Sequence, residues 1–560
     1  MRILGLSAHH RDAAAALVVD GRLVAAAQEE RFTRRTLDPA FPTRAVRWCL
    51  ASTGIASSAL DRVVFYEKPL RKFERVLARS LQGFPRSARS FPRSAFLWLG
   101  ERLWIRNRIA EEFSLPPERV LFLDQARSQL ANAFFTSPFE EAALLLLDDV
   151  CEWTSVALGR GWGASVELEL ELCHPHSLGL FASAITQFLG FAPGEEEHKL
   201  AALSAFGEPR QAGILGELVR ARGAFFELAE DAFRFDDGAS RLFGPELEAR
   251  LGPARRSGER LRWEAGDSRD AELAASAQRL IEERALALAR ELHRRSALEN
   301  LCLAGLLAQN ARLVARIAEE GPFRRIHVPA APGKAGGALG AALFAQHVLD
   351  PGAREAPPIA IGEEIGGRPE EGARELGGAP AAAEELALRV GSGELVGWAR
   401  GRLEFAARSQ GRRVALAAPR PQARARLHAA LHQVESFLPC RLAMPAGETA
   451  RFLDLASASE GPAELGLVVV RAREALRALA PDAFLPDGRV WPRVVRERED
   501  PELHGLLVRL GQENGAPLAL LADLALRGSP LVRNEAEAVE AFRRSGLDAL
   551  VVESRVYTRA

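Results

Sequence analysis

A glycine-rich stretch in the middle of the chain contains residue types that could bind a phosphate group. It reads VPAAPGKAGGALGAAL over residues 328–343 and includes Lys334, Gly336 and Gly337. Glycines let a loop approach a phosphate closely, and the start of a following helix favours an anion. Lys334 is one of only four lysines among 73 basic residues. The stretch lacks the hydroxyl residue and the spacing of a P-loop, so other roles for this lysine have to be considered.

Two further segments group residues that could bind a ligand. CHPHS (173–177) offers a thiol and two histidines, including His176, but no fourth ligand at zinc spacing, which favours a structural turn. Residues 84–108 alternate arginine with Phe and Trp, a pattern found in proteins that bind single-stranded nucleic acid. The low net charge disfavours that role, and a helical insert that packs by its aromatics is the commoner arrangement. Trp and Arg are also typical interface anchors, so a protein-partner surface is the functional role that we prefer for this segment.

The elements that would position these residues occur in two similar sets. Three short β-rich runs open the chain, with a hairpin signal at Asp20-Gly21, and an amphipathic helix follows over 42–53. The strand pattern returns as AALLLLDDV (142–150), TSVALGRGW and SVELELELC. Two such sets predict an internally duplicated α/β domain. Actin-like proteins of the sugar-kinase and Hsp70 type have this layout, in which two acidic turns face a cleft.

A second domain is predicted beyond a change in composition. The segment after residue 350 is rich in Pro, Gly, Ala and Glu, which is typical of an extended crossover. Strands and helices alternate again up to the last residue. We therefore predict an N-terminal domain over 1–350, a linker over 351–382 and an α/β C-terminal domain over 383–560.

The composition narrows the classes of protein and of partner. Hydrophobic residues make up 48% and charged residues 26% of the 560 residues, as in globular proteins. The net charge is −1, so no whole-chain field indicates nucleic acid or a membrane as a partner. Five cysteines without a CxxC pair indicate a reduced protein. Neither a signal peptide nor a membrane-spanning run is recognisable, and we expect a cytoplasmic protein.

Several motifs, in this order along the chain, resemble the natural-product and nodulation-factor O-carbamoyltransferases. They are LGLSAHHRDAAAALVVDGRLVAAAQEERFTRR, HPHSLGLFASAITQFLGF, NLCLAG, AGGALGAAL, GRLEFAARSQGRR and GLDALVV. The resemblance covers nearly the whole chain and implies an actin-like N-terminal domain and a C-terminal domain similar to threonylcarbamoyl-adenylate synthases. It also implies that the C-terminal domain makes carbamoyl adenylate from carbamoyl phosphate and ATP. The N-terminal domain, with a bound metal, would then transfer the carbamoyl group to a hydroxyl.

The metal ligands that the resemblance implies are largely replaced in this chain. Two histidines four residues apart on one helical face would bind the metal together with aspartates from two loops. Gln125 and Gln129 stand at the histidine positions, Lys334 replaces one aspartate, and Asp148 matches the other. A neutral amide is a weak ligand and an ammonium cannot ligate a cation. We therefore expect no metal, and we predict that Lys334 pairs with Asp148 while a glutamine donates to the same carboxylate. The alternative is a solvent-facing Lys334.

The C-terminal motifs have diverged as well. The resemblance gives Glu404, Arg408 and Arg413 the task of holding carboxylate, phosphate or adenylate groups. Val434 and Leu438 stand where the phosphate clamp would have arginines, and neither can replace a guanidinium. The loop expected to contact the adenylate is apolar in this chain, at Leu521, Ala522 and Ala525. Glu197 and Lys199 match the acceptor pocket, with a solvated acidic run as the alternative.

Two functions of different class follow from these observations. The first is a non-catalytic carbamoyltransferase homologue that binds or scaffolds, as a homo-oligomer or in a hetero-oligomer with an active paralogue. The second is a working O-carbamoyltransferase that uses ATP and carbamoyl phosphate through a rebuilt site. That site would contain Asp148, Glu197, Lys199, Lys334, Arg408 and Arg413, with Glu404, Gly336 and Gly337 as further ligand-binding positions.

Overall fold

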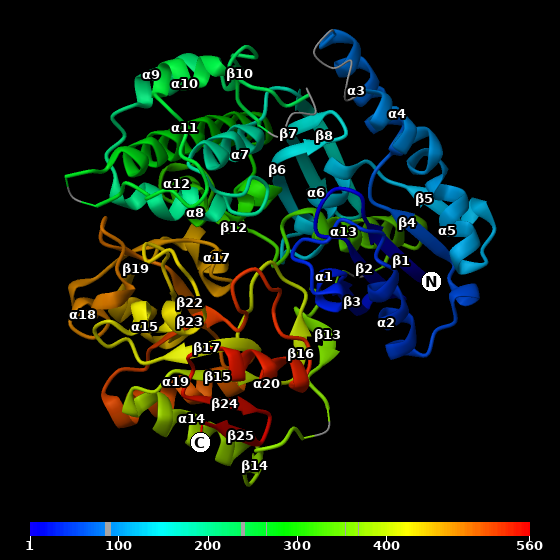
Figure 1. The fold of residues 1–560 in the computed structure, drawn as a ribbon. Coiled ribbons are helices and arrows are strands. Elements are labelled where there is room, and N and C mark those ends of the chain that lie inside the picture. Colours follow the sequence, from blue (N-terminus) through cyan, green and yellow to red (C-terminus); the bar gives the residue numbers. More distant parts are fainter. Residues whose placement is uncertain are drawn as a thin grey trace.

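The fold consists of two related five-stranded sheets followed by a larger mixed sheet (Figure 1). The structure is a computed structural model. It describes residues 1–84, 91–236, 241–264, 266–352, 354, 356–367 and 369–559, without the side chains of 91, 93, 94 and 97. In the described residues, no helix is both long and apolar enough to cross a bilayer.

The first sheet has the strand order β3-β2-β1-β4-β5. Its first three strands are antiparallel, and the last two run parallel to β1. Asp20 and Gly21 join β2 to β3 with φ of 48° and 81°, the left-handed conformations of a tight hairpin turn, as predicted. The strands are β1 (Arg2–Ser7), β2 (Ala14–Val19), β3 (Arg22–Gln28), β4 (Arg62–Phe65) and β5 (Val120–Phe122).

The second sheet repeats this arrangement. Its order is β12-β11-β6-β7-β8, again with three antiparallel strands and two that are parallel to the first of them. The shared order and direction confirm the predicted duplication and the actin-like fold. The strands are β6 (Glu141–Cys151), β7 (Thr154–Trp162), β8 (Ser165–Cys173), β11 (Asn300–Ala304) and β12 (Arg325–His327).

Two helices lie between these sheets and carry the residues of most interest. Helix α6 (Gln125–Phe135) contacts β6, β8 and β11, and helix α13 (Lys334–Leu349) contacts β1, β2 and β4. The two helices also pack on each other. Other helices cover the outer faces or connect the strands: α1 (Glu30–Thr33), α2 (Thr43–Thr53), α3 (Pro69–Gln82), α4 (Phe91–Gly100), α5 (Ile105–Phe113), α7 (Leu178–Phe188), α8 (Glu197–Leu203), α9 (Ala212–Leu218), α10 (Pro245–Leu251), α11 (Arg269–Ser296) and α12 (Ala311–Glu320).

The glycine-rich stretch differs from the predicted phosphate-binding loop. Helix α13 begins at Lys334, so Gly336, Gly337 and Gly340 lie inside the helix and are buried. A Cβ atom at Gly340 would lie 1.8 Å from the backbone oxygen of Ser128 on α6, and one at Gly336 would lie 2.0 Å from the oxygen of Ala331. The glycines therefore allow α13 to pack closely against its neighbours.

The C-terminal domain is built on an eight-stranded sheet of order β14-β25-β24-β15-β17-β23-β18-β22. Helices α14 (Ala379–Ser392) and α19 (Pro501–Asn514) pack together, while α20 (Glu535–Arg544) contacts β24 and β15. The sheet strands are β14 (Arg374–Glu375), β15 (Val396–Ala399), β17 (Arg413–Ala417), β18 (Arg441–Pro445), β22 (Pro492–Val495), β23 (Ala519–Asp523), β24 (Ala549–Val552) and β25 (Arg555–Thr558).

The predicted linker contains regular structure. Strand β13 (Ala360–Glu364) pairs with β16 (Arg402–Glu404), and β14 pairs with β25. The predicted boundary at residue 383 falls inside α14, which already begins at Ala379. The abundance of Pro and Gly in this segment indicated a crossover, but long-range strand pairing, which composition does not reveal, incorporates parts of it into the C-terminal domain.

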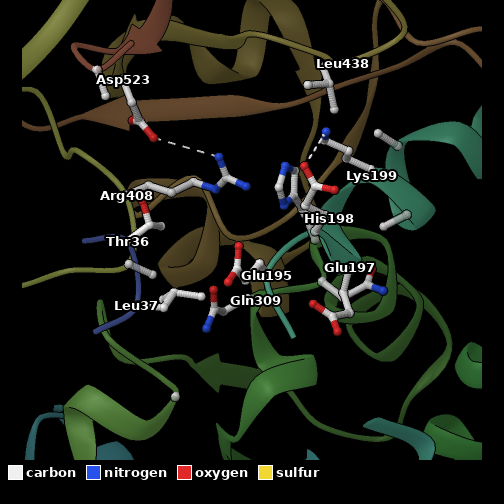
Figure 2. A pocket seen from close by; sticks show the side chains of 18 of the residues that line it. Thr36, Leu37, Glu195, Glu197, His198, Lys199, Gln309, Arg408, Leu438 and Asp523 are labelled. Atoms are coloured by element: carbon white, nitrogen blue, oxygen red, sulfur yellow. Dashed lines mark ion pairs between the residues drawn. The ribbon is translucent and has the colours of Figure 1, made fainter. Parts of the chain in front are cut away.

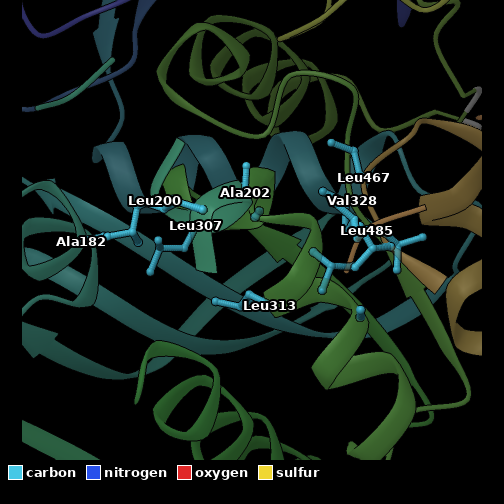
Figure 3. Close-up of a cluster of buried hydrophobic side chains, with 14 of the residues drawn as sticks. Ala182, Leu200, Ala202, Leu307, Leu313, Val328, Leu467 and Leu485 are labelled. Carbon is cyan, nitrogen blue, oxygen red and sulfur yellow. The ribbon is translucent and has the colours of Figure 1, made fainter. Parts of the chain in front are cut away.

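One buried apolar cluster crosses the boundary between the two domains (Figure 3). Leu313 and Val328 of the N-terminal domain belong to the same cluster as Leu467 and Leu485 of the C-terminal domain. Helix α17 (Glu460–Glu464) of the C-terminal domain also contacts β12. Shared apolar burial of this kind stabilises one arrangement of the domains and thereby fixes the shape of the space between them.

Candidate functional site

A cavity of about 630 Å³ lies where the two domains meet. Its N-terminal wall includes Asp148, Lys334 and the segment 194–202, and its C-terminal wall includes Arg408 and residues 521–531. Figure 2 shows Glu195 and His198 on one side and Arg408 on the other, with their side chains turned toward the same space. The volume suits a small organic ligand and its neighbouring groups.

The ammonium group of Lys334 is surrounded by oxygen atoms at the floor of the cavity. Its Nζ atom lies 2.8 Å from Asp148 Oδ2, 2.9 Å from Asp149 Oδ1 and 3.0 Å from the backbone oxygen of Val150. Gln129 Nε2 donates to the same Asp148 Oδ2 over 2.6 Å. These contacts confirm the predicted pairing of Lys334 with Asp148 and the predicted hydrogen bond from a glutamine.

Asp149 is a second acid of this cluster that the sequence analysis did not assign. Burial opposes its ionisation, but Lys334, His10 and Arg11 outweigh burial and hold the pKa of Asp149 well below its usual range. Arg11 Nη2 lies 2.5 Å from Asp149 Oδ2. Burial also opposes a charged Lys334, yet Asp148 and Asp149 raise the pKa of the lysine above its ordinary value. The doubled aspartate in LLLLDDV was the available signal for this position.

The residues around Asp148 do not fit a divalent metal. Gln125 is fully buried, and neither its Nε2 nor its Oε1 atom has a hydrogen-bond partner within the described part of the chain. Gln129 already donates to Asp148, and Lys334 places a positive charge where another ligand would be needed. No group of three or more His, Cys, Asp or Glu side chains among the described residues is arranged to hold a metal ion.

Arg408 contributes a positive charge on the C-terminal wall of the cavity, opposite Lys334. Its Nη1 atom lies 3.8 Å from Asp523 Oδ2, and its guanidinium group stacks 5.4 Å from the centre of the Trp491 ring. Its side chain donates no hydrogen bond to any residue that the structure describes. Desolvation in the cavity, with Arg408 and Lys199 nearby, lowers the pKa of His198 to about 3, so that imidazole is neutral at physiological pH. The wall at Arg408 thus keeps donors for an anionic group.

Glu197 and Lys199 line the cavity, but other residues occupy their charged groups. Glu197 Oε1 accepts from the backbone NH of Gly194 over 2.5 Å and from the hydroxyl of Ser183. Lys199 Nζ lies 2.5 Å from Glu196 and 2.6 Å from Glu435 of the C-terminal domain. Lys199 therefore ties the domains together, which is a role that its position in an acidic run did not indicate.

Two of the residues expected to hold ligand groups lie outside the cavity lining. Arg413 is fully buried and donates to the backbone oxygens of Arg400 and Gly401. Glu404 accepts from the backbone NH of Gln410 over 2.9 Å and from that of Arg412 over 2.5 Å. Both side chains face inward because they satisfy the backbone of the turns around them, which corrects their assignment as ligand-binding residues.

Of the positions at which apolar residues replace the expected polar ones, some line the cavity and one does not. Val434 is 69% exposed and does not line the cavity, so its replacement of an arginine has no bearing there. Leu438, Leu521, Ala522 and Ala525 do line it and make that part of the wall apolar. The four apolar residues alternate in the lining with charged ones, among them Arg408, Asp523 and Arg527.

The histidines of CHPHS lie apart from the cavity and have structural partners. His174 Nε2 is 2.7 Å from Asp236 Oδ1, and the backbone NH of Leu228 donates to His176 Nδ1 over 3.2 Å. These contacts confirm the predicted structural turn. The predicted partner surface at 84–108 is described only in part, because residues 85–90 lie outside the described residues.

Comparison with known proteins agrees with the motifs. Residues 2–343 match the family model "Carbamoyltransferase N-terminus" and residues 387–559 match "Carbamoyltransferase C-terminus". The solved ROK hexokinase of Thermus thermophilus is 16% identical and covers 61% of this chain and 98% of its own, with a TM-score of 0.30.

Curated relatives match over nearly the whole chain. The uncharacterized protein sll1178 of Synechocystis is 34% identical over 100% of this chain and 96% of its own length. Nodulation protein NolNO of Sinorhizobium fredii is 28% identical over 97% of this chain and 78% of its own. With both family models matched and the duplicated sheets in place, the chain belongs to the carbamoyltransferase family.

Proposed function

We propose that this member of the carbamoyltransferase family is a non-catalytic subunit that retains a ligand-binding cavity. The observation that carries the proposal is the ammonium of Lys334, which lies within 3.0 Å of oxygens of Asp148, Asp149 and Val150. An ammonium group held by three oxygen acceptors satisfies their charge and fills the space between them. A divalent metal needs that space and those acceptors. The proposal therefore includes the absence of a metal cofactor.

The C-terminal wall supports the same proposal. Adenylate and carbamoyl phosphate chemistry needs several donors that converge on phosphate oxygens. Arg413 is used on backbone oxygens, and Arg441 donates to Ser409 O and lies 2.6 Å from Asp523. Arg408 and Arg527 face the cavity with donors that no described residue accepts, and each has one carboxylate neighbour, at 3.8 Å and 3.7 Å. These groups can bind an anion, but the arginines that would converge on a phosphate, Arg413 and Arg441, are used within the protein.

A binding subunit needs a catalytic partner, and an active paralogue is the partner that we propose. The pair would act on a natural product or saccharide in the cytoplasm, and self-association into a homo-oligomer is compatible with this role. Co-purification with an intact family member that retains the two histidines would support the pairing. An isolated chain with full transferase activity would contradict it.

The direct test is ATP–pyrophosphate exchange that depends on carbamoyl phosphate, measured with the purified full-length chain. We expect no exchange above background, while a family member with intact motifs serves as the positive control. Calorimetric titration with carbamoyl phosphate and with ATP should still detect binding that requires Arg408. Robust exchange would overturn the proposal.

Working O-carbamoyl transfer is the second candidate, and the cavity that joins both domains favours it. Asp148, Glu197, Lys199, Lys334 and Arg408 all line this one space. A carbamoyl adenylate made on one wall could reach an acceptor hydroxyl on the other without leaving the cavity. Formation of a carbamoylated product from ATP, carbamoyl phosphate and an aminoglycoside or oligosaccharide would establish this function instead.

A further inference from the structure

The insert between β4 and β5 carries the strongest concentration of exposed apolar side chains in the described chain. Helices α3 and α4 in this insert extend away from the two sheets (Figure 1). Six large apolar residues between positions 70 and 104 are 57–82% exposed: Leu70, Leu81, Phe84, Phe96, Leu99 and Trp104. Exposed apolar groups gathered on one projection mark a surface that contacts something other than water.

The same insert concentrates positive charge. Between Lys68 and Arg108 the sequence has eleven lysines and arginines but only two acidic residues, in a chain whose net charge is −1. Arg71, Arg106 and Arg108 are exposed, and none of them forms an ion pair with a carboxylate in the described part of the chain. Other basic residues of the insert are paired: Lys72 lies 2.6 Å from Glu67, and Arg79 lies 2.8 Å from Glu230 and 2.9 Å from Asp236. The positive charge that stays without an acidic partner in the described part of the insert therefore includes Arg71, Arg106 and Arg108, and the whole-chain charge conceals it.

We propose that the projecting insert, α3 and α4 with Trp104, docks on an anionic lipid surface. On helix α3, Leu70, Phe73, Leu77 and Leu81 are spaced along one side, and Leu70 and Leu81 are largely exposed. Lys72 and Arg79 on the other side pair with acids of the protein, so the apolar side is the one that faces outward. A helix whose apolar side faces outward can lie in the headgroup region, where apolar side chains enter the boundary with the acyl chains. Unpaired arginines next to them are attracted by anionic headgroups.

A lipid surface accounts for both the projection and the charge better than a protein groove does. The exposed side chains lie on helices that extend outward, so they can enter a soft, flat surface without a matching cavity. The whole-chain charge argued against a membrane partner, but peripheral docking depends on the local charge within a Debye length of the surface. This contact is independent of the proposed role of the interdomain cavity.

The test is co-sedimentation of the full-length protein with vesicles. We expect weak binding to phosphatidylcholine alone and at least tenfold stronger binding when an equal amount of phosphatidylglycerol is added, with loss of binding at high salt. Arg71→Gln should weaken binding about fivefold. Phe96→Ser should weaken binding about as much, because the phenyl ring that would enter the lipid boundary is lost. Arg210→Gln and Trp162→Ser, at exposed positions outside the insert, are the matched controls and should bind as the unchanged chain does.

The fluorescence of Trp104 gives a second readout that does not depend on sedimentation. The emission of the unchanged chain should shift to shorter wavelength with anionic vesicles, and the shift should be reduced in Trp104→Phe. Equal binding to neutral and anionic vesicles, or control variants that weaken binding as much as Arg71→Gln, would overturn the proposal. Binding to polyglutamate without binding to vesicles would also overturn it and would indicate an acidic protein partner.

Discussion

Lys334 and Arg408 line the same cavity from opposite domains, but their charges are used differently. Three oxygens of the protein surround the ammonium of Lys334 at 2.8–3.0 Å. Arg408 has one carboxylate neighbour, at 3.8 Å, and its side chain is about one-third exposed to the cavity. A cation that is fully paired within the protein stabilises the fold, whereas a cation with unused donors remains available to a ligand. One cavity can therefore contain a cation that is used by the fold and a cation that is open to a ligand.

Removing the ammonium should have the largest effect on stability. Lys334→Met leaves Asp148 and Asp149 buried without their cation and should lower the free energy of unfolding by about 3–5 kcal/mol. Lys334→Asp should lower it further because it adds a third acid. Urea denaturation measures both effects. Lys68→Met is the matched control, because Lys68 is 39% exposed and lies 3.5 Å from Asp124, where loss of a surface pair costs about 0–1 kcal/mol. A Lys334 variant as stable as the control would show that its pairing carries little energy.

Rebuilding the ligand set that the family resemblance implies should convert the paired site into a metal site. The combined variant Gln125→His, Gln129→His and Lys334→Asp removes the ammonium and supplies two imidazoles on one face of α6. We expect about one transition metal per chain by elemental analysis, and a denaturation midpoint that falls when a chelator is added. Lys334→Asp alone is the control and should bind none. If the combined variant binds no metal, the site differs from the one that the resemblance implies at more than these three positions.

The α/β fold and much of its organisation follow from the sequence. Alternating strands and the Asp20-Gly21 turn predicted both sheets, because side-chain periodicity and turn chemistry are local properties. The Lys334–Asp148 pair was predicted because a buried acid requires a cation and lysine is scarce in this chain. By contrast, Arg413 and Glu404 turned inward to backbone groups, and only the packing of distant turns decides that.

Arg408 should affect ligand binding without affecting the fold. Arg408→Met removes donors that no described residue uses, so affinity for carbamoyl phosphate or another small anion should fall about tenfold or more. The free energy of unfolding should stay within about 0.5 kcal/mol of that of the unchanged protein. Calorimetric titration and denaturation measure the two quantities, and Arg210→Gln, at an exposed turn before α9, is the control. Unchanged affinity would remove Arg408 from the anion site.

The smallest expected effect concerns Glu152. This buried acid forms no ion pair with any described residue. Burial, together with nearby Glu67, raises its pKa to about 7. An acid with a raised pKa in the folded state resists ionisation there, so its contribution to stability falls as the pH rises from about 4.5 to 7. Glu152→Gln should flatten that part of the profile by on the order of 1 kcal/mol. Urea midpoints at pH 5 and pH 8 for both proteins measure it, and identical slopes would contradict it.

The sequence by itself determined the family and the duplicated domain, because these depend on residue types and their order. Only the tertiary structure decided how each remaining charge is used. Gly336 and Gly337 became packing positions because Asn132 of α6 and Tyr66 approach them closely, and Lys199 became a tie between domains because Glu435 lies 2.6 Å away. Such roles depend on contacts between residues far apart in the chain, and local sequence patterns do not predict those contacts.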